Sequence, residues 1–475
     1  MDKQNLTMLT DFYELTMANG YFLEGMGDKT VYFDLFYRRN PENGGYVIAA
    51  GLQPLIDYLK NIRFTEDDLA FLKKKGMDDR FLDYLRNFKF ACDVWAVPEG
   101  TPVFPYEPLV VVRGPAIQAQ FIETMALLLI SHQSLIATKS NRIVRAAEGR
   151  AIMEFGSRRA HGSDAAIMGA RSAFIGGVAG TACAICEPEF GIPALGTMAH
   201  SWVQLFDTEY DAFYAYAKHY PDNCTLLVDT YDVLKSGVPN AIKVFDELKP
   251  NKKGIRIDSG DIAYLTKKAR KMLDDAGHSD AKIVISNSLD EYIIRDVLRQ
   301  GAFIDSFGVG ERLITSKAEP VLGGVYKLAA VEKEDGTIVP KIKVSENVEK
   351  VTNPGYKKVY RLFDEDGVAF ADVITLADEP APTPGSYTVV DPQSPRMIKY
   401  LDSDFEVREL LVPIFQGGKL VYDCPDLQDI KAHCKESVDH VWEEVLRFEN
   451  PHRYYVDLSP KLWELKNKML EEYDI

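Results

Sequence analysis

The sequence predicts an α/β protein, an irregular (β/α) barrel with a flanking mixed α/β domain that the N- and C-terminal segments build together. Three observations support this: the length of 475 residues, a repeated pattern of apolar runs and polar turns, and a change of that pattern on either side. At roughly 100–200 residues per domain, more than one domain is expected. We expect an N-terminal α/β segment at 1–115, the barrel at 116–325, and a C-terminal segment at 326–475 with strands and then helices that pack with the N-terminal part.

The barrel prediction rests on a series of short apolar runs, each of which ends in a polar or Gly-rich turn and precedes an amphipathic stretch. Strands that are buried on both faces and alternate with helices form parallel sheets. Six or more such units favour a barrel, whose chemistry lies at the carboxyl ends of the strands. The runs are 151–155, 192–195, 226–228, 254–257, 283–285 and 304–307.

The flanking segments have a different sequence pattern, which predicts separate strands, hairpins and helices. Residues 31–37 read as a strand, and 326–343 and 357–374 as strand pairs around Asp-Gly turns at 335–336 and 366–367. The stretches 426–448 and 458–473 are expected to close the chain as two helices.

The charge balance limits the partners. Lys and Arg number 55 against 71 Asp and Glu, a net charge of −16, which disfavours nucleic acid or an anionic membrane surface as the main partner. No stretch approaches the roughly 20 apolar residues that a membrane helix needs, and 125–130 has only six. The first residues lack the basic-then-apolar order of a secretion signal. Six cysteines are too few for a disulfide framework, so we expect a reducing, cytoplasmic setting.

Polar residues gather where the predicted barrel strands end. Gly-rich turns after the last strands expose backbone N–H groups and form the usual phosphate site of such barrels. Arg matches carboxylate or phosphate groups with paired hydrogen bonds, and carboxylates beside a phosphate hold Mg²⁺ or ribose hydroxyls. The set therefore indicates a phosphorylated sugar handled together with a small anion. Its members are Arg158, Arg159, Arg256, Asp229, Asp258, Asp261, His200 and the turns 308–310 and 323–324.

Each of these signals also has an ordinary structural interpretation. A single His at a strand end is more often structural than catalytic, and the segment 258–261 is also a common helix N-cap. Cys183 and Cys186 have the spacing of half a zinc or redox site, with Cys424 and Cys434 as distant partners. A helix packed on the barrel explains that pair more simply, so we expect no resident metal site.

Eight strings, in the same order along the chain, resemble the nicotinate phosphoribosyltransferase family. Single matches of this length arise by chance, but eight in order are highly specific. They are LTDFYELTM (9–17), YRR (37–39), EFGSRR (154–159), GTMAHS (196–201), RIDSGD (256–261), FGVG (307–310), GGVYKL (323–328) and NPHRYYVDLS (450–459).

The resemblance implies a reaction in which nicotinate and 5-phosphoribosyl 1-pyrophosphate give nicotinate mononucleotide and pyrophosphate, with ATP hydrolysed to ADP and phosphate. This is the entry step of NAD salvage, and Mg²⁺ would accompany the phosphorylated substrates. The resemblance also implies a homodimer with active sites at the subunit interface. Alternatives are a nicotinamide- or quinolinate-specific phosphoribosyltransferase of the same barrel superfamily, or an idle barrel that serves as a scaffold.

The resemblance assigns a role to each matching residue. His200, which ATP would transiently phosphorylate, and Asp258, beside the ribose, are the catalytic candidates. Residues 176–181 contain no carboxylate, whereas the nicotinamide-using sister enzyme carries an Asp there, so an anionic substrate is expected. The nicotinate-binding candidates are Tyr13 (from the neighbouring subunit), Phe155, Arg158, Thr197 and Arg256. The phosphoribosyl pyrophosphate-binding candidates are Ser259, Gly308, Gly310, Thr315, Gly323 and Gly324.

Overall fold

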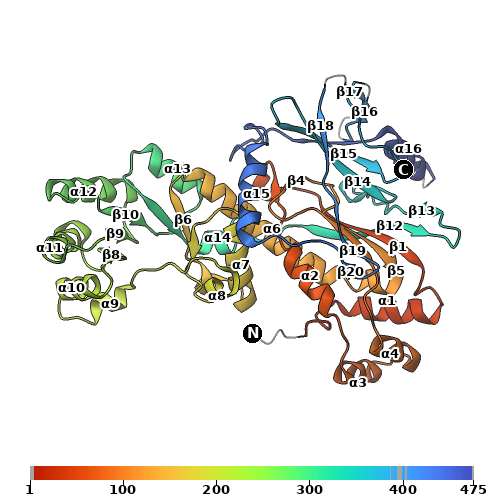
Figure 1. The fold of residues 1–475 in the computed structure, drawn as a ribbon, viewed down its shortest axis with the longest axis horizontal. Coiled ribbons are helices and arrows are strands. Elements are labelled where there is room, and N and C mark those ends of the chain that lie inside the picture. The colour runs from red at the N-terminus through yellow and green to blue at the C-terminus, as the bar shows by residue number, and fades with distance from the viewer. Residues whose placement is uncertain (1–4, 386, 393–397, 402–403, 473–475) are drawn as a thin grey trace. The chain divides into compact units, whose positions relative to one another are not determined.

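The computed structural model describes residues 5–385, 387–392, 398–401 and 404–472 (Figure 1). The chain forms two compact units: unit 1 combines residues up to 135 with those from 321 onward, and unit 2 spans 136–320. The expected segment boundaries at 115/116 and 325/326 both fall within unit 1, and the domain division drawn from the sequence stays a prediction.

Unit 1 contains a seven-stranded sheet whose strands come from both ends of the chain. Its middle strands are antiparallel: β1 (Thr30–Tyr37) pairs with β12 (Gly324–Glu332) on one side and β5 (Val110–Pro115) on the other. The two chain segments therefore share one core. The remaining strands are β3 (Asp93–Ala96), β19 (Val412–Gln416) and β20 (Lys419–Leu420) beyond β5, and β13 (Ile338–Pro340) beyond β12.

A second, six-stranded sheet of unit 1 is C-terminal. Its centre is the hairpin of β14 (Lys357–Phe363) and β15 (Ala369–Leu376), which turns at the expected Asp-Gly pair, and β21 (Tyr455–Leu458) lies parallel to β15. The other strands are β16 (Tyr387–Val390), β17 (Ile398–Leu401) and β18 (Glu406–Glu409), and β2 (Val47–Ile48) and β4 (Pro102–Val103) form a separate pair.

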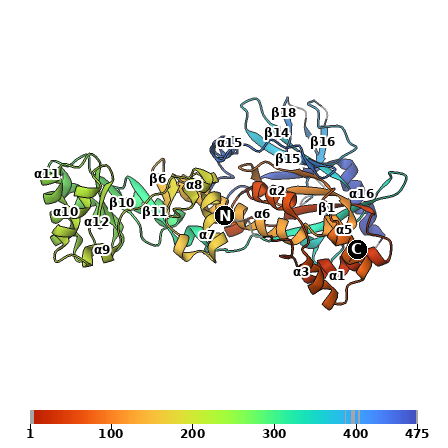
Figure 2. The same ribbon diagram turned by 60° about the horizontal axis from the view of Figure 1, so that its bottom comes forward.

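Several helices of unit 1 pack together beside the seven-stranded sheet (Figures 1 and 2). Leu15, Leu72 and Phe81 belong to one apolar cluster, which also includes Ile117 of a short helix after β5. All α-helices of unit 1 in the described residues are α1 (Phe12–Leu23), α2 (Leu52–Asn61), α3 (Glu66–Lys74), α4 (Asp79–Arg86), α5 (Ala116–Gln120), α15 (Leu427–Asp439) and α16 (Pro460–Glu471), and α6 (Glu123–Ala146) continues into unit 2.

The two C-terminal helices differ from the sequence prediction. The helix expected over 426–448 ends at Asp439, and Val441 instead forms an isolated bridge with Ala369. The segment expected to be helical from 458 begins as the end of β21. Ser459 then caps α16, because its side chain accepts the Leu462 N–H and Pro460 occupies the first helical turn.

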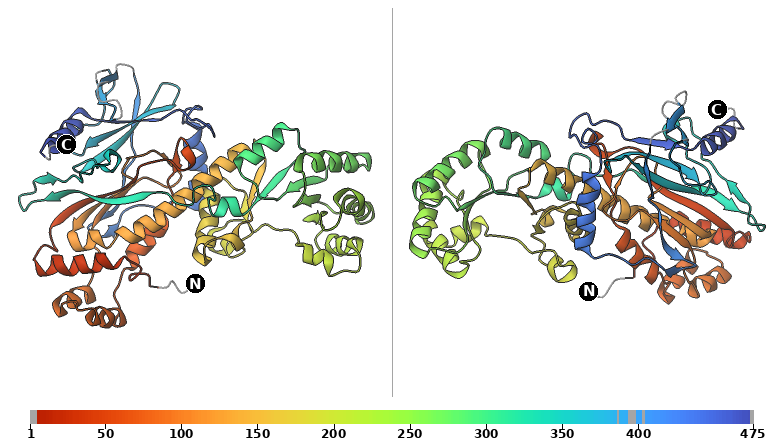
Figure 3. Two further views of the ribbon diagram at one scale, coloured as in Figure 1. Left: turned by 180° about the vertical axis from the view of Figure 1, so that it is seen from behind. Right: turned by 45° about the horizontal axis from the view of Figure 1, so that its top comes forward.

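Unit 2 contains a parallel, half-barrel sheet of six strands with helices between successive strands (Figure 3). Strand order is β7 (Gly180–Thr181), β6 (Ala151–Glu154), β11 (Ser306–Val309), β10 (Lys282–Ile285), β9 (Lys253–Ile257) and β8 (Cys224–Leu227). The helices are α7 (Ser163–Ile175), α8 (Cys186–Phe190), α9 (His200–Gln204), α10 (Glu209–His219), α11 (Val238–Leu248), α12 (Ile262–Asp275), α13 (Glu291–Arg299) and α14 (Glu311–Ile314).

The strand expected at 192–195 is reduced to one bridge. Ala194 pairs with Thr181, whose N–H donates to the Pro193 carbonyl at 3.0 Å. Proline has no N–H to donate to a ladder, and Gly191 before it adopts a left-handed conformation with φ of 68°. An extended segment therefore lies against β7 without becoming a full strand.

One helical stretch, 116–146, is long and apolar enough by length and composition to cross a membrane. In its most apolar window, 61% is buried inside the protein, which is the pattern of a core helix.

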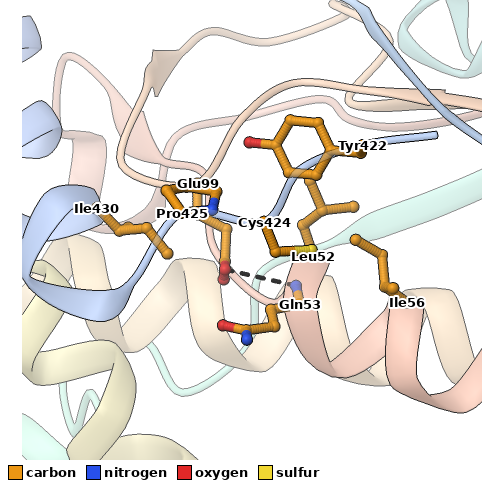
Figure 4. A pocket seen from close by; sticks show the side chains of 8 residues that line it. All are labelled: Leu52, Gln53, Ile56, Glu99, Tyr422, Cys424, Pro425 and Ile430. Carbon is orange, nitrogen blue, oxygen red and sulfur yellow. Dashed lines mark hydrogen bonds between the residues drawn. The ribbon is translucent and has the colours of Figure 1, made fainter. Parts of the chain in front are cut away.

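A small cavity lies beside the first turn of α2, lined by Leu52, Tyr422 and Ile430 among others (Figure 4). Gly51 precedes this helix and has no side chain to cap it. The buried Glu99 supplies the missing acceptor, with Oε1 2.6 Å from Gly51 N and Oε2 3.4 Å from Gln53 N. The cavity of about 10 Å³ has room for about one water molecule and is too small for a substrate.

A buried charged cluster joins the N- and C-terminal segments of unit 1. Arg361 Nε and Nη2 donate to the two carboxylate oxygens of Asp372 at 2.8 and 2.6 Å, and the Tyr454 hydroxyl donates to Asp372 at 2.9 Å. The guanidinium lies 5.3 Å from the centre of the Phe104 ring. Burial, and then the Asp372 carboxylate, raise the pKa of Glu107 well above its usual range, so the protonated form of Glu107 is favoured in the folded state.

Glu107→Gln should therefore change how stability depends on pH. A carboxyl whose pKa is raised by folding contributes stability below its unfolded pKa of about 4.3, and that contribution is lost as pH rises through the folded value. The free energy of unfolding of the variant, relative to the wild type, should rise as the pH increases above about 5, by up to about 1.4 kcal/mol per pH unit. Urea unfolding at three pH values measures this difference, and a difference that does not change with pH would contradict it.

Candidate active site

Phe155 directly follows β6 at the carboxyl edge of the parallel sheet. Its N–H donates to the Val309 carbonyl at 2.8 Å, which continues the pairing of β6 with β11. A Cβ at Gly308 would lie 2.4 Å from a carbon of the Phe155 ring. Because no side chain fits at that distance, glycine at position 308 is what allows the ring to lie against β11. The sheet thus presents a half-buried aromatic ring at this edge.

Arg256, in β9, has a guanidinium that is bonded to several chain segments. Its Nε donates to Ser286 Oγ at 2.8 Å, and its Nη1 donates to Thr197 Oγ1 at 2.8 Å and to the Met198 carbonyl at 3.2 Å. The guanidinium carbon lies 5.9 Å from the centre of the Phe155 ring. A cation is therefore fixed beside an aromatic ring, with 14% of its side chain exposed.

Asp258 and Asp229 hold the turn after β9. Asp258 Oδ1 accepts the Ser286 hydroxyl at 2.5 Å and lies 3.4 Å from Arg256 Nη2. Asp229 Oδ2 accepts the Asp258 N–H at 3.1 Å and the Ser259 hydroxyl at 2.6 Å. The other oxygen, Asp229 Oδ1, is buried and has no hydrogen-bond partner among the described residues. The site therefore has an acidic side next to the Arg256 cation.

His200 is the first residue of α9 and lies on this acidic side. Its Nδ1 is 3.1 Å from Thr230 Oγ1, and its Nε2 is 4.0 Å from Asp229 Oδ1 and 3.9 Å from Asp258 Oδ2. The side chain is 41% exposed, so a ligand can reach it. An imidazole that is held on one nitrogen and open to solvent is a competent nucleophile at neutral pH.

Glu154, the last residue of β6, fixes the turn that carries Phe155. One carboxylate oxygen accepts the Gly156 N–H, and the other accepts the Thr181 hydroxyl at 2.6 Å. Burial raises the pKa of Glu154 above its usual value. Thr181 belongs to the stretch 176–181, which has no carboxylate of its own. The carboxylate beside that stretch comes from β6, and both its oxygens are occupied by internal donors.

The remaining unit 2 candidates follow β6 and β11. Gly310 precedes α14, and a Cβ there would lie 3.1 Å from the Phe155 carbonyl. Thr315 ends the same helix, with its hydroxyl donating to the Glu311 carbonyl at 2.7 Å. Arg158 is exposed on the single 3₁₀ turn Ser157–Arg159 and does not belong to the hydrogen-bonded cluster around Arg256.

Three candidates belong to unit 1. Tyr13 is in α1, its side chain is substantially exposed, and partial burial and the neighbouring Glu123 carboxylate raise its pKa. A Cβ at Gly324 would lie 2.5 Å from Ser131 Oγ, whereas one at Gly323 would meet no atom within 4 Å. A side chain at position 324 would collide with Ser131, which explains the glycine there. Position 323 has space for a side chain, so packing does not explain its glycine.

The structure thus brings together Phe155, Thr197, His200, Arg256, Asp258 and Ser259. The cluster has three further members. Asp229 belongs to the predicted polar set at the strand ends but had no assigned role, and Thr230 and Ser286 were not predicted. Ser286 directly follows β10, and Asp229 and Thr230 lie just beyond the end of β8, so their position near strand ends was the available signal. Glu154 carried no such signal, because a buried carboxylate inside a strand is recognisable only from its partners.

No group of three or more His, Cys, Asp or Glu side chains in the described part of the chain is arranged to hold a metal ion. Cys186 opens α8 and is buried, with Cys183 beside it, and burial raises the pKa of the Cys186 thiol to about 12.

Comparisons with known proteins agree along the whole chain. Three family models match: the nicotinate phosphoribosyltransferase N-terminal domain over residues 8–131, the nicotinate phosphoribosyltransferase family over 150–361 and the nicotinate phosphoribosyltransferase C-terminal domain over 356–466. Nicotinate phosphoribosyltransferase of Bacillus subtilis is 43% identical over 472 residues, covering 98% of this chain and 96% of that protein. The human protein of that name is 31% identical, covering 97% and 96%.

Solved structures give the same result for the fold. The crystal structure of human nicotinic acid phosphoribosyltransferase has a TM-score of 0.85 and 29% identity, covering 97% of this chain and 99% of that one. A nicotinate-nucleotide pyrophosphorylase from Pyrococcus furiosus shares the fold at a TM-score of 0.69 and 23% identity, covering 92% and 96%. On the family models and these relatives, the chain belongs to the nicotinate phosphoribosyltransferase family.

Proposed function

We propose that this chain joins nicotinate to the phosphoribosyl group of 5-phosphoribosyl 1-pyrophosphate, with ATP hydrolysed to ADP and phosphate, as the entry step of NAD salvage. Family membership supports the reaction, and one observation supports the substrate. This is the Arg256 guanidinium, held 5.9 Å from the Phe155 ring by Ser286, Thr197 and Met198. A planar, anionic ring needs such a pairing of an aromatic surface with a cation.

In the proposed complex, the pyridine ring stacks on Phe155 and its carboxylate accepts hydrogen bonds from Arg256 and Thr197. The exposed Arg158 supplies a second cation from the turn after β6. Glu154 is fully buried and its two oxygens already accept internal hydrogen bonds, from Gly156 and Thr181, so it is poorly placed to accept a nicotinamide NH₂. This occupied carboxylate supports nicotinate over nicotinamide.

The transfer itself forms a bond from the pyridine nitrogen to ribose C1 as the bond from C1 to pyrophosphate breaks. Asp258 is suitably charged to hold ribose hydroxyls and to stabilise the positive charge that develops at C1. Ser259, Gly308, Gly310, Thr315, Gly323 and Gly324 are the proposed contacts of the phosphate groups.

Mg²⁺ would enter with the phosphorylated substrates. Asp229 Oδ1 is a buried carboxylate oxygen without a described partner, and Asp258 Oδ2 is nearby on the same side of His200. One or two carboxylates together with substrate phosphates suit this hard cation, which would offset phosphate charge. These residues therefore fit the ion.

We further propose that ATP phosphorylates His200. Its Nε2 faces the two aspartates, Thr230 contacts its Nδ1, and the side chain is open to a ligand. The phosphoryl group would pass from ATP to an imidazole nitrogen, with ADP leaving, and then to water.

The proposed assembly is a homodimer in which Tyr13 of the neighbouring subunit covers the pyridine. α1 and the residue stretch before it expose large apolar side chains, Leu9, Phe12, Tyr13 and Met17, which a second copy would bury. In that assembly the parallel sheet is the core of an irregular (β/α) barrel, flanked by a mixed α/β domain made from N- and C-terminal segments. The six cysteines are free, which supports a cytoplasmic setting.

Pyrophosphate release with nicotinate, nicotinamide or quinolinate, with and without ATP, tests the substrate. Losing a charge-assisted hydrogen bond costs about 1.5–3 kcal/mol, so nicotinate should exceed nicotinamide in kcat/KM by about 10- to 150-fold. Equal use of nicotinamide, or a preference for quinolinate, would refute the proposed pocket, and no release with any pyridine would favour a scaffold role.

γ-Labelled ATP should place an acid-labile label on a peptide that contains His200. The variant His200→Asn should lose both the label and the stimulation by ATP, while some ATP-independent transfer persists, because Phe155 and Arg256 still position the pyridine. His219→Asn is the matched control, since His219 is exposed in α10. A His200→Asn enzyme that still couples ATP normally would make the histidine structural.

Mixing Tyr13→Ala with Arg158→Ala subunits should restore activity if the site is shared between subunits. Each mixed dimer would contain one site with both defects and one intact site. Random exchange of equal amounts then gives about a quarter of wild-type activity, from two variants that are each nearly inactive. Verified subunit exchange without any recovery would show that Tyr13 and Arg158 do not serve one site across an interface.

A further inference from the structure

Ser286 occupies a defined place between the two charged groups of the site. It directly follows β10, is 6% exposed, and its N–H donates to the Ile257 carbonyl at 3.1 Å, which continues the pairing of β10 with β9. The position of its side chain is therefore set by the sheet. Its hydroxyl lies between a cation and an anion that both project from β9 or the turn after it.

The Ser286 hydroxyl both accepts and donates a hydrogen bond. Ser286 Oγ accepts the Arg256 Nε–H at 2.8 Å and donates its hydrogen to Asp258 Oδ1 at 2.5 Å. A serine hydroxyl has one hydrogen to give, so this hydrogen is committed to the carboxylate. The direct contact from Arg256 Nη2 to Asp258 Oδ1 is longer, at 3.4 Å. The two hydrogen bonds through Ser286 are therefore shorter than the direct contact between Arg256 and Asp258.

This arrangement decides which part of the guanidinium faces a ligand. Nε is occupied by Ser286, and Nη1 by Thr197 and the Met198 carbonyl. Nη2 has only its long contact with Asp258 within the described part of the chain. An incoming carboxylate therefore meets Nη2, provided that Arg256 does not collapse onto Asp258.

We propose that Ser286 is a positioning residue that determines substrate charge specificity. It keeps Arg256 and Asp258 apart, so that Nη2 stays available to the carboxylate of the pyridine and Asp258 stays oriented toward the ribose. The inference rests on the proposed function, because it assigns the pyridine carboxylate to Arg256. Without the hydroxyl, the 3.4 Å contact between Arg256 Nη2 and Asp258 Oδ1 would shorten to a close ion pair, and Nη2 would no longer be available to the substrate.

The test compares Ser286→Ala and Ser286→Cys with the wild type. Cysteine keeps nearly the shape of serine but hydrogen-bonds weakly, so it separates hydrogen bonding from packing. Both variants should raise KM for nicotinate at least tenfold, with a smaller change in kcat, and should lower the kcat/KM preference for nicotinate over nicotinamide by a similar factor. Ser279→Ala, an exposed serine before β10, should leave all values unchanged.

The outcomes separate the inference from the function it rests on. Wild-type protein that does not prefer nicotinate refutes the proposed function, whatever the variants do. Wild-type protein that prefers nicotinate, with Ser286→Cys retaining KM and preference within twofold, overturns the role of Ser286 alone. If Ser286→Ala does not fold, as shown by circular dichroism, Ser286→Cys decides the question. An equal loss in Ser279→Ala would also overturn the proposal.

Discussion

The Arg256 guanidinium is the group on which the rest of the site depends. It joins β9 to the segment at Thr197 and Met198 and to Ser286 after β10, and it lies beside the Phe155 ring after β6. Burying a cation is costly unless its hydrogen bonds are satisfied. The carboxyl edge of a parallel sheet meets that condition, because several strand ends bring their polar residues to one place.

The same edge separates opposite charges over a short distance. Asp229 and Asp258 lie on the His200 side, while Arg256 lies on the Phe155 side, and Ser286 connects the two. The transition state of the proposed reaction would match this order of charges, because the pyridine has a negative carboxylate and positive charge develops at the ribose. Selectivity and catalysis would then have one electrostatic origin.

Much of this could be predicted from the sequence, because buried parallel strands are marked by short apolar runs followed by polar turns. Five of the six expected runs became strands of the parallel sheet, and the polar residues after them meet in the structure. The run at 192–195 failed because Pro193 cannot extend a ladder. The bond of Ser286 to Arg256 and the bond of Glu154 to Thr181 could not be predicted, since their partners lie 30 and 27 residues apart along the chain.

A crystal structure of the protein with bound nicotinate mononucleotide tests the central claim most directly. We expect one oxygen of the pyridine carboxylate within about 3 Å of Arg256 Nη2, with the ring stacked on Phe155 and the Arg256 Nε bond to Ser286 preserved. A pyridine carboxylate bound elsewhere, with Arg256 paired only to Asp258, would contradict the account.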